Sequence, residues 1–343
     1  MKFIKKWILP SLIVVILVLA ALISYVLQPS GTLKEFDAWL PSEQTVQAHP
    51  DSLNTLLRVH YFGTSTLLFD DGETQILIDG FFSRPSLSKV IFGKINSSPT
   101  VIQNMIQRYQ LTRNQAIFVS HSHYDHALDI SELAKQLPHT RIVGTQSSLN
   151  IARGNKIAES QLRLVKPFES LQLGAFKVTP IPSQHTPATA VNNDLGEEIK
   201  TPLTLPARYN AFKEGGSFDY LIEHLGYKIL VKASTGAIDQ QLKDIQVDTL
   251  FLGIAQLSKQ PKSYQEQYLQ NSLGLTQPKR VIPIHWDNFF KGLDQPFEFL
   301  PRIADNSPES LRIFIQAAEK QGSQVTLLTQ PDAYYFGDDF KPL

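Results

Sequence analysis

The chain of 343 residues contains no cysteine. This absence excludes disulfide bonds, cysteine-ligated zinc and thiol nucleophiles, and it leaves the redox compartment undetermined. Charge of one sign is not in excess either, because 32 basic residues balance 32 acidic ones. A formal net charge of zero gives no electrostatic case for nucleic acid as a partner. What the sequence does contain is ample apolar material for a full core.

The amino-terminal end differs in composition from the rest of the chain. Residues 1–6 form a basic end with three lysines, and residues 7–27 form a charge-free apolar run long enough, as a helix, to cross a membrane. Lysines before such a run favour a cytoplasmic amino terminus. The sequence therefore predicts a single-pass signal-anchor in the cytoplasmic membrane, with the remaining chain on the outer (periplasmic or extracellular) side. A cleaved signal peptide is the alternative, because residues 18–20 offer a tolerable cleavage site, although the apolar run continues past them.

The rest of the chain divides into an arm and one domain. Residues 28–50 are polar with several prolines, which predicts a linker or arm, and apolar side chains within residues 36–40 could pack on the domain. Residues 51–339 have the size of one α/β domain. Apolar runs predict strands at residues 56–62, 65–69, 74–78, 116–119, 141–144, 176–181, 220–224, 228–232, 249–252, 280–284 and 324–328. Apolar residues at helical spacing predict helices at residues 99–109, 130–137 and 308–321.

The segment IFVSHSHYDHALD, residues 117–129, holds the densest group of potential metal ligands. His121, His123, Asp125 and His126 form the pattern H-x-H-x-D-H directly after a predicted strand. Imidazole together with carboxylate is the ligand mixture that suits zinc, iron or manganese. A histidine-rich polar loop without a metal is the alternative, but chance rarely produces this pattern in a chain with nine histidines.

Two further histidines follow predicted strands. His185 comes after residues 176–181, and His285 comes after residues 280–284. Each of them alone would more often be a hydrogen-bonded structural histidine. Because all these side chains follow apolar strands, the sequence predicts that they converge with the motif at one sheet edge, as a rigid catalytic centre requires.

The pattern H-x-H-x-D-H after a β-strand resembles the signature of the metallo-β-lactamase-like superfamily, and the resemblance covers about residues 59–287. It implies an α/β fold, the four-layer αβ/βα sandwich with one or two metals between the layers, here preceded by the amino-terminal transmembrane helix. It also implies two ligand sets: His121, His123 and His185 for one metal, and Asp125, His126 and His285 for the second.

Two positions modify what the resemblance implies. Superfamily members usually carry an aspartate that bridges both metals, and Ser234 stands at that position. Loss of this charge predicts a single metal, a loosely held second metal or a bridge made only by hydroxide. Asp239, five residues further along, could replace the missing carboxylate, but its spacing in the sequence does not favour that role. Asp79 resembles an aspartate that supports the metal loop without binding metal, and a strand-end turn residue is the alternative.

The ligand set predicts a hydrolase. A bound dication, with Zn²⁺ first and Mn²⁺ or Fe²⁺ as alternatives, lowers the pKa of its water to about 7, so that a metal-bound hydroxide could cleave an ester-type bond such as a lactone or phosphodiester. Asp125 is the candidate catalytic residue, because it could bind the second metal and also hold the proton of the attacking water.

The sequence gives less information on the substrate. Together with the motif, the segments HYFGTSTLLF and ILIDGFFSRP resemble the branch that includes N-acyl-phosphatidylethanolamine phospholipase D and ascorbate-6-phosphate lactonase more than the antibiotic-hydrolysing β-lactamases. A small-molecule or lipid-like substrate follows as an expectation. The long loop at residues 186–216 is a candidate lid. The candidate pocket residues are Tyr124, Trp286, Asp287, Phe289 and Phe290.

Two other functions remain open at this point. The domain could be a metal-binding or sensing scaffold without turnover, for which the serine at position 234 is the hint. It could also be a di-iron protein that reduces oxygen or nitric oxide, since related sandwiches can carry such a centre. That chemistry needs an electron donor, and the sequence has no appended flavin-binding domain.

Overall fold

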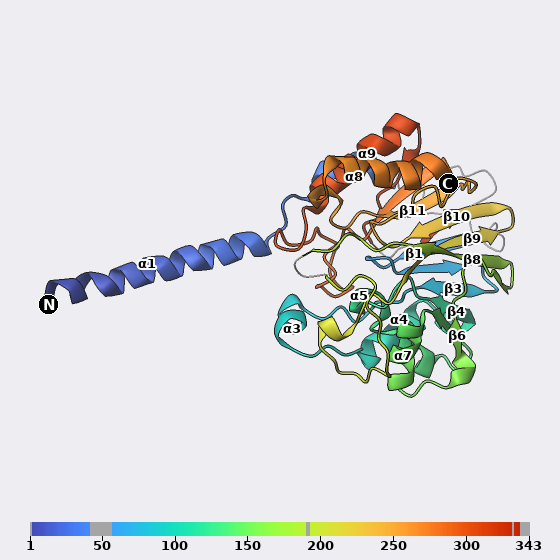
Figure 1. Cartoon of the computed structure of the whole chain (residues 1–343), viewed down its shortest axis with the longest axis horizontal. Helices are drawn as coiled ribbons and strands as arrows, with labels where there is room; N and C mark the ends of the chain where they lie inside the picture. Colours follow the sequence, from blue (N-terminus) through green and yellow to red (C-terminus); the bar gives the residue numbers. More distant parts are fainter. Residues whose placement is uncertain (1, 42–56, 190–192, 331–332, 337–343) are drawn as a thin grey trace.

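Two β-sheets of seven strands each form the centre of the molecule in the computed structural model. The structure describes residues 2–41, 57–189, 193–330 and 333–336, so the end of the predicted linker and the outermost residues of the predicted domain lie outside the described residues. Helices cover the outer face of each sheet, as Figure 1 shows, with α4 and α7 on one side and α8 and α9 on the other. The arrangement is the α/β sandwich that the sequence predicted.

The first sheet has the strand order β14-β1-β2-β3-β4-β5-β6. Its strands are β1 (Leu57–Tyr61), β2 (Leu67–Asp70), β3 (Gln75–Ile78), β4 (Asn114–Phe118), β5 (Arg141–Gly144), β6 (Leu162–Leu164) and β14 (Ala333–Phe336). From β14 to β3 the neighbours are antiparallel, and from β3 to β6 they are parallel. Helices join the parallel strands, because a parallel connection needs a crossover.

The second sheet has the order β13-β12-β11-β10-β9-β8-β7. Its strands are β7 (Leu171–Leu173), β8 (Phe176–Ser183), β9 (Ser217–His224), β10 (Tyr227–Lys232), β11 (Thr249–Gly253), β12 (Arg280–Ile284) and β13 (Gln324–Val325). Strands β7 to β10 are antiparallel, and β10 to β13 are parallel. Strands β4, β8, β10 and β12 therefore deliver the segments that follow them to one edge of the sandwich.

The helices are short apart from the first and last. The α-helices are α1 (Lys2–Leu27), α3 (Leu87–Phe92), α4 (Pro99–Arg108), α5 (Tyr124–Ala127), α6 (Ile130–Gln136), α7 (Gln146–Gly154), α8 (Lys262–Leu269) and α9 (Ser307–Gln321). A π-helical turn, η7 (Gln270–Gly274), continues α8. The 3₁₀ turns are η1 (Leu33–Trp39), η3 (Leu111–Arg113), η4 (Glu159–Gln161), η5 (Tyr209–Ala211) and η6 (Leu257–Lys259).

Two apolar cores hold the layers together. Between the sheets, the ring of Phe69 lies 6.1 Å from that of Phe251, and this core extends to α9 through Phe314. The other core lies between the first sheet and its covering helices and includes Leu77 of β3 and Ile102 of α4. Strands β2, β3, β11 and β12 are buried on both faces, which explains their largely apolar sequences.

Helix α1 projects away from the sandwich in Figure 1. It begins at Lys2 and ends at Leu27, so it includes the basic residues that precede the apolar run 7–27, because lysine is a good helix former. Residues 10–27 have a mean hydropathy of 2.7 and none of them is buried, so by length and composition this is a helix that could cross a membrane. The arm that follows packs on the domain, where the Phe36 ring lies 5.6 Å from that of Phe299.

Several predicted elements differ from the structure. Strand β2 begins at Leu67 and not at residue 65, because Ser65 leaves the ladder to donate a hydrogen bond to Asp79. The last predicted strand shortens to Gln324–Val325. Helices α3, α5, α7 and α8 and strands β6, β7 and β14 were not predicted. Helix α8 is polar in composition with little helical periodicity, so packing decides its structure, whereas α7 does carry a buried apolar face that includes Leu149 and Ala152.

Candidate metal centre

The motif and the two later histidines meet at the edge where strands β4, β8 and β12 end. Strand β4 ends at Phe118, and the chain then runs extended to His123, the residue before α5. The short helix α5 places Asp125 and His126 next to each other in its single turn. His185 follows β8 by two residues and His285 follows β12 directly. The predicted convergence at one edge is confirmed.

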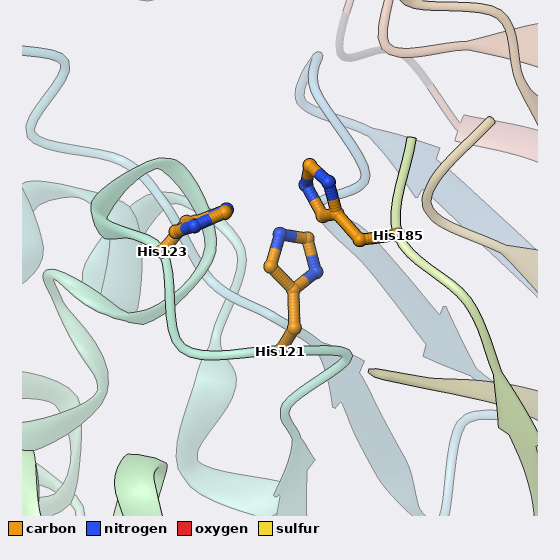
Figure 2. Close-up of side chains that lie close together, drawn as sticks. All are labelled: His121, His123 and His185. Atoms are coloured by element: carbon orange, nitrogen blue, oxygen red, sulfur yellow. The ribbon is translucent and has the colours of Figure 1, made fainter. Parts of the chain in front are cut away.

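His121, His123 and His185 form the first group, which we call the histidine trio. One ligand-type nitrogen from each ring lies within 4.8 Å of the others. Figure 2 shows the three rings turned toward a common point from two separate segments of the chain. The His185 ring lies 4.7 Å from each of the other two, measured between centroids. Three imidazoles at this spacing match the requirements of a transition-metal ion.

The trio has partners that fix which ring nitrogen faces the centre. The Nδ1 of His185 lies 2.9 Å from the carbonyl oxygen of Thr186, so it donates there and leaves Nε2 as the lone-pair donor. The Nε2 of His123 lies 3.1 Å from Oδ1 of Asp194, which leaves Nδ1 for a metal. Asp194 was not predicted, because it lies 71 residues further along the chain in the long loop. Its partnership with His123 follows the pattern of metal-ligating histidines.

Asp125, His126 and His285 form the second group, which we call the Asp125 group. Their ligand-type atoms also lie within 4.8 Å of one another. Oδ2 of Asp125 lies 3.4 Å from Nε2 of His285 and 3.7 Å from Nε2 of His126. The two groups adjoin, since the centroids of the His121 and His126 rings are 3.9 Å apart. The structure thus brings together all six residues that the resemblance implied as ligands.

A buried network orients the Asp125 group. Asp79 is fully buried, and its Oδ2 lies 2.8 Å from Nδ1 of His126. The same carboxylate accepts hydrogen bonds from the hydroxyl of Ser65 and from the backbone and hydroxyl of Ser120. Because an ionised carboxylate can only accept, His126 carries its proton on Nδ1 and presents Nε2 to the centre. Asp79 directly follows strand β3, so its position is compatible with both interpretations of this residue.

Two residues of the centre have left-handed backbone conformations. Asp79 has φ 58° and His285 has φ 60°. Such values are costly for residues other than glycine and persist where the surroundings impose them. The amide of His285 donates to the carbonyl oxygen of Thr64 at 2.6 Å, which fixes the turn after β12. The turn directs the His285 ring toward Asp125.

Burial and mutual proximity change the proton affinities of the ligands. Burial, together with neighbouring imidazoles, holds the pKa of His121 well below its usual range and lowers that of His185 to about 3. Burial alone would raise the pKa of Asp125, but His126 and His285 hold it well below its usual range. For the His285 imidazole the effects have the opposite sign: burial alone would lower its pKa, but the neighbouring Asp125 carboxylate raises it. Asp125 is therefore ionised and the imidazoles of His121 and His185 are neutral at neutral pH.

No second carboxylate joins Asp125 in either group, as far as the described residues show. Ser234 follows β10 and lines the same cavity, which is where the resemblance put the bridging position. The next turn packs against a ligand, because a Cβ at Gly236 would overlap with the carbonyl oxygens of Gln184 and His185. Asp239 belongs to neither group. Asp305, which the sequence reasoning missed, lines the cavity, and its carboxylate accepts from the backbone amide of Gln256 at 2.9 Å.

Both groups open into a cavity of about 450 Å³. Residues 193–213 of the long loop form one wall of the cavity. They are attached to helix α7, because the Asn150 side chain donates a hydrogen bond to the Ile199 carbonyl oxygen at 2.6 Å. Residues 190–192 of this loop lie outside the described residues. Much of the remaining wall is apolar, with Leu87, Ile91, Phe212, Phe289, Phe290, Leu300 and Ile303.

The structure corrects two predicted pocket residues. Tyr124 lines the cavity as predicted, but Trp286 and Asp287 point into the interior. The Trp286 ring lies 5.5 Å from that of Phe299. The Asp287 carboxylate is fully buried, where it pairs with Arg84 at 2.8 Å. The left-handed turn at His285 explains the orientation of Trp286 and Asp287, because it changes which side of the chain faces the cavity.

Comparison with known proteins gives a family match over most of the domain. A family model described as the Beta-lactamase superfamily domain matches residues 74–286, more than half of the chain. A protein of Methylacidiphilum infernorum described as a UPF0173 metal-dependent hydrolase is 30% identical over 80 residues, which are 23% of this chain and 28% of that protein. The chain therefore spans little more than a quarter of the length of this curated relative.

Solved structures give more distant similarities. Igni18, a novel metallo hydrolase from Ignicoccus hospitalis, has 15% identity and a TM-score of 0.48, over 82% of this chain and 99% of that one. The metallo-beta-lactamase fold protein YhfI from Bacillus subtilis has 14% identity and a TM-score of 0.49, over 82% of this chain and 100% of that one. CmlA, a diiron beta-hydroxylase from Streptomyces venezuelae, has 14% identity and a TM-score of 0.49, over 84% of this chain and 55% of that one.

Proposed function

The chain belongs to the beta-lactamase superfamily, and from this premise we propose that it is a membrane-anchored, metal-dependent hydrolase that cleaves an ester-type bond, either a lactone or a phosphodiester. The observation that carries the proposal is the convergence of six ligand-type side chains, in two adjoining groups, on one cavity. The description of the Methylacidiphilum relative as a metal-dependent hydrolase supports the dependence on a metal.

The residues of the centre fit a metal. Nε2 of His121 and Nε2 of His126 are buried and have no hydrogen-bond partner among the described residues. A buried polar atom without a partner costs about 1–3 kcal/mol, and coordination of a cation removes this cost. The histidine trio would hold one ion and the Asp125 group a second. When bound, a dication lowers the pKa of a coordinated water to about 7 and polarises the oxygen atom under attack.

The donor set favours zinc. Five imidazoles and one carboxylate suit Zn²⁺, and Mn²⁺ or Fe²⁺ are the alternatives with the same donors. Because His121 and His185 are neutral at neutral pH, no proton must leave them when a cation binds. The trio is thus ready to accept a cation under ordinary conditions.

Asp125 is the proposed catalytic residue. Its carboxylate lines the cavity and is ionised, because His126 and His285 lower its pKa. It lies between the two groups, where it can accept a proton from the attacking water as well as bind an ion. The cavity also contains the Asp194 carboxylate, but that group is engaged by His123. Asp125 is therefore better placed to hold the proton.

The anchor is proposed from α1. Its apolar segment is exposed along its length, and exposed apolar surface of this extent is unfavourable in water. The lysines in residues 2–6 favour an amino terminus in the cytoplasm, so the catalytic domain would lie on the outer side of the cytoplasmic membrane. This arrangement gives a single-pass membrane enzyme.

The choice between a lactone and a phosphodiester rests on the resemblance to the branch of N-acyl-phosphatidylethanolamine phospholipase D and ascorbate-6-phosphate lactonase. The alternative function is a metal-binding or sensing scaffold without turnover. Ser234 favours that alternative, because it takes the bridging position without a charge. The amount of bound metal and the turnover of soluble substrates separate the two functions.

The test is elemental analysis combined with a hydrolysis screen on full-length protein in detergent, purified without added metal or chelator. We expect one to two equivalents of zinc, manganese or iron, and hydrolysis of a soluble lactone or phosphodiester. His121→Ala should lose both the metal of the trio and the activity, whereas His139→Ala, an exposed histidine outside both groups, should keep them. Bound metal without turnover of either substrate class would favour the scaffold, and no uptake on titration would contradict both functions.

A further inference from the structure

The cavity opens at the point where α1 joins the domain. Residues in the segment 300–305 form one part of the cavity wall, and residues of helix α3 form another part. The same segment binds the end of α1, because the amide of Ile303 donates to the carbonyl of Val26 and the amide of Arg302 donates to that of Gln28, both at 3.0 Å. Ile303 therefore both lines the cavity and contacts the root of the predicted anchor.

The root of α1 is held rigidly. The Arg302 guanidinium donates to the carbonyl oxygens of Tyr25 and Gln28, each at 3.2 Å, and lies 4.5 Å from the centre of the Tyr25 ring. The Tyr25 carbonyl belongs to the last turn of the helix and also accepts from the Gln28 amide at 3.4 Å, and Gln28 follows the helix directly, so Arg302 supplies a further donor where helix ends lack them. An aromatic ring and an arginine at this position are typical of the membrane–water interface. The domain therefore cannot turn freely with respect to the bilayer that α1 would cross.

Apolar side chains project from the rim of the cavity on the same side. Ile303 is 59% exposed, and on α3 Ile91 is 46% and Phe92 is 80% exposed. We call these three residues the lip. In Figure 1, α3 lies on the side of the sandwich from which α1 projects. Lys89 and Lys94 flank the lip and are exposed, and residues 85–99 contain no acidic residue.

We propose that the lip inserts into the headgroup layer of the bilayer, so that the cavity opens toward the lipid phase. The inference rests on the proposed anchor and deepens it. Exposed apolar and aromatic side chains flanked by lysines are the composition of a surface that binds an anionic bilayer. A bilayer, and not a second protein, is the partner that the rigid root of α1 brings to this surface. An amphiphilic substrate could then enter the apolar side of the cavity without crossing water.

The opposite end of the domain provides a matched control. Leu225 is 69% exposed in the turn between β9 and β10. Strand β10 runs from this turn toward Ser234 at the cavity, so Leu225 lies at the far end of the strand. It is as exposed and apolar as the lip residues, but the proposed orientation places it in water.

The test uses the absence of cysteine from the chain, which makes each introduced cysteine a unique labelling site. Full-length Phe92→Cys, Ile303→Cys and Leu225→Cys carry a nitroxide label in vesicles of phosphatidylcholine and phosphatidylglycerol. The measurement compares relaxation of the label by oxygen, which partitions into lipid, with relaxation by a water-soluble nickel complex. We expect the labels at positions 92 and 303 to favour oxygen and the label at position 225 to favour nickel. Preference for nickel at all three positions would overturn the proposal.

A second measurement links the lip to the reaction. Phe92 lies outside the cavity wall, so Phe92→Ser should leave hydrolysis of a short, soluble ester unchanged. Turnover of a long-chain ester embedded in the vesicles should fall by roughly tenfold, the factor expected when one large apolar side chain is lost from lipid. Leu225→Ser should change neither. Equal effects of Phe92→Ser on both substrates would contradict the proposal. Lipid-exposed labels without any hydrolysis would instead contradict the hydrolase and leave the docking surface standing.

Discussion

The histidine trio and the Asp125 group adjoin, yet they are built differently. The trio consists of imidazoles only, and its partners are the Thr186 carbonyl for His185, Asp194 of the long loop for His123, and the buried Ser120 hydroxyl for His121. The Asp125 group contains the one carboxylate of the centre, and its His126 is fixed by Asp79, Ser65 and Ser120 in a fully buried network. The trio thus depends in part on the long loop, through His123, whereas the support of His126 in the Asp125 group comes from the core.

The two groups also differ in how protons compete with a metal. In the trio, burial keeps His121 and His185 neutral. In the Asp125 group, the carboxylate that attracts a cation also attracts a proton to His285, whose pKa it raises. In the trio, protons compete weakly with a metal, whereas in the Asp125 group the raised pKa of His285 makes a proton a stronger competitor. This difference, and not only the serine at position 234, predicts a tightly bound first ion and a weaker second one.

The largest effect is expected from Asp125→Asn. The amide keeps the size of the side chain but can no longer hold the proton of the attacking water, so kcat should fall by about 10²–10⁴-fold. The metal of the trio should remain, as elemental analysis can show. Asp239→Asn is the control, because Asp239 belongs to neither group. An unchanged kcat in Asp125→Asn would exclude the catalytic role.

Asp194→Asn and Asp79→Asn test whether the two groups are supported separately. Each change replaces a carboxylate that orients one histidine with an amide. Such changes typically reduce metal affinity by about 10–100-fold. Competition with a chelator should show a weaker trio ion in Asp194→Asn and a weaker Asp125-group ion in Asp79→Asn. If both variants weakened the same ion, the division between loop and core would be wrong. Thermal unfolding of Asp79→Asn checks that the buried network still folds.

The pH dependence of metal content should separate the groups without mutation. As the pH falls through the raised pKa of His285, protonation should weaken the ion of the Asp125 group by about tenfold per pH unit. The trio should keep its ion to a lower pH, since the pKa of His185 is lowered to about 3 and that of His121 is also lowered. Elemental analysis after dialysis at a series of pH values measures this. Simultaneous loss of both ions would contradict the difference.

The smallest effect is expected from Ser234→Asp. The added carboxylate would face both groups and should tighten the second ion, by about tenfold if its charge reaches the bridging position. Metal titration of the full-length protein measures the second binding step. Ser234→Asn is the control, because it adds similar volume without charge. Equal binding in Ser234→Asp and Ser234→Asn would show that position 234 does not bridge the two ions.

Much of the fold was predictable from local sequence. The apolar runs before residues 121, 185 and 285 predicted strands, and strands β4, β8 and β12 occupy those places. Gly322, with φ 84°, ends helix α9 at the predicted residue. Such strands and helix ends depend on residues close together in the chain, so the local sequence predicts them. Helix α8 was missed because its polar sequence has little helical periodicity, so its structure depends on tertiary packing.

The chain by itself determined the ligand types, their order and their positions after strands, because side-chain chemistry and strand length are local properties. The tertiary structure decided which partners these ligands have. Asp194 meets His123 across 71 residues, and the turn at His285 sends Trp286 and Asp287 into the interior. It also joined the end of α1 to Ile303 at the mouth of the cavity. Such contacts arise from the path of loops between distant elements, and no local period in the sequence encodes that path.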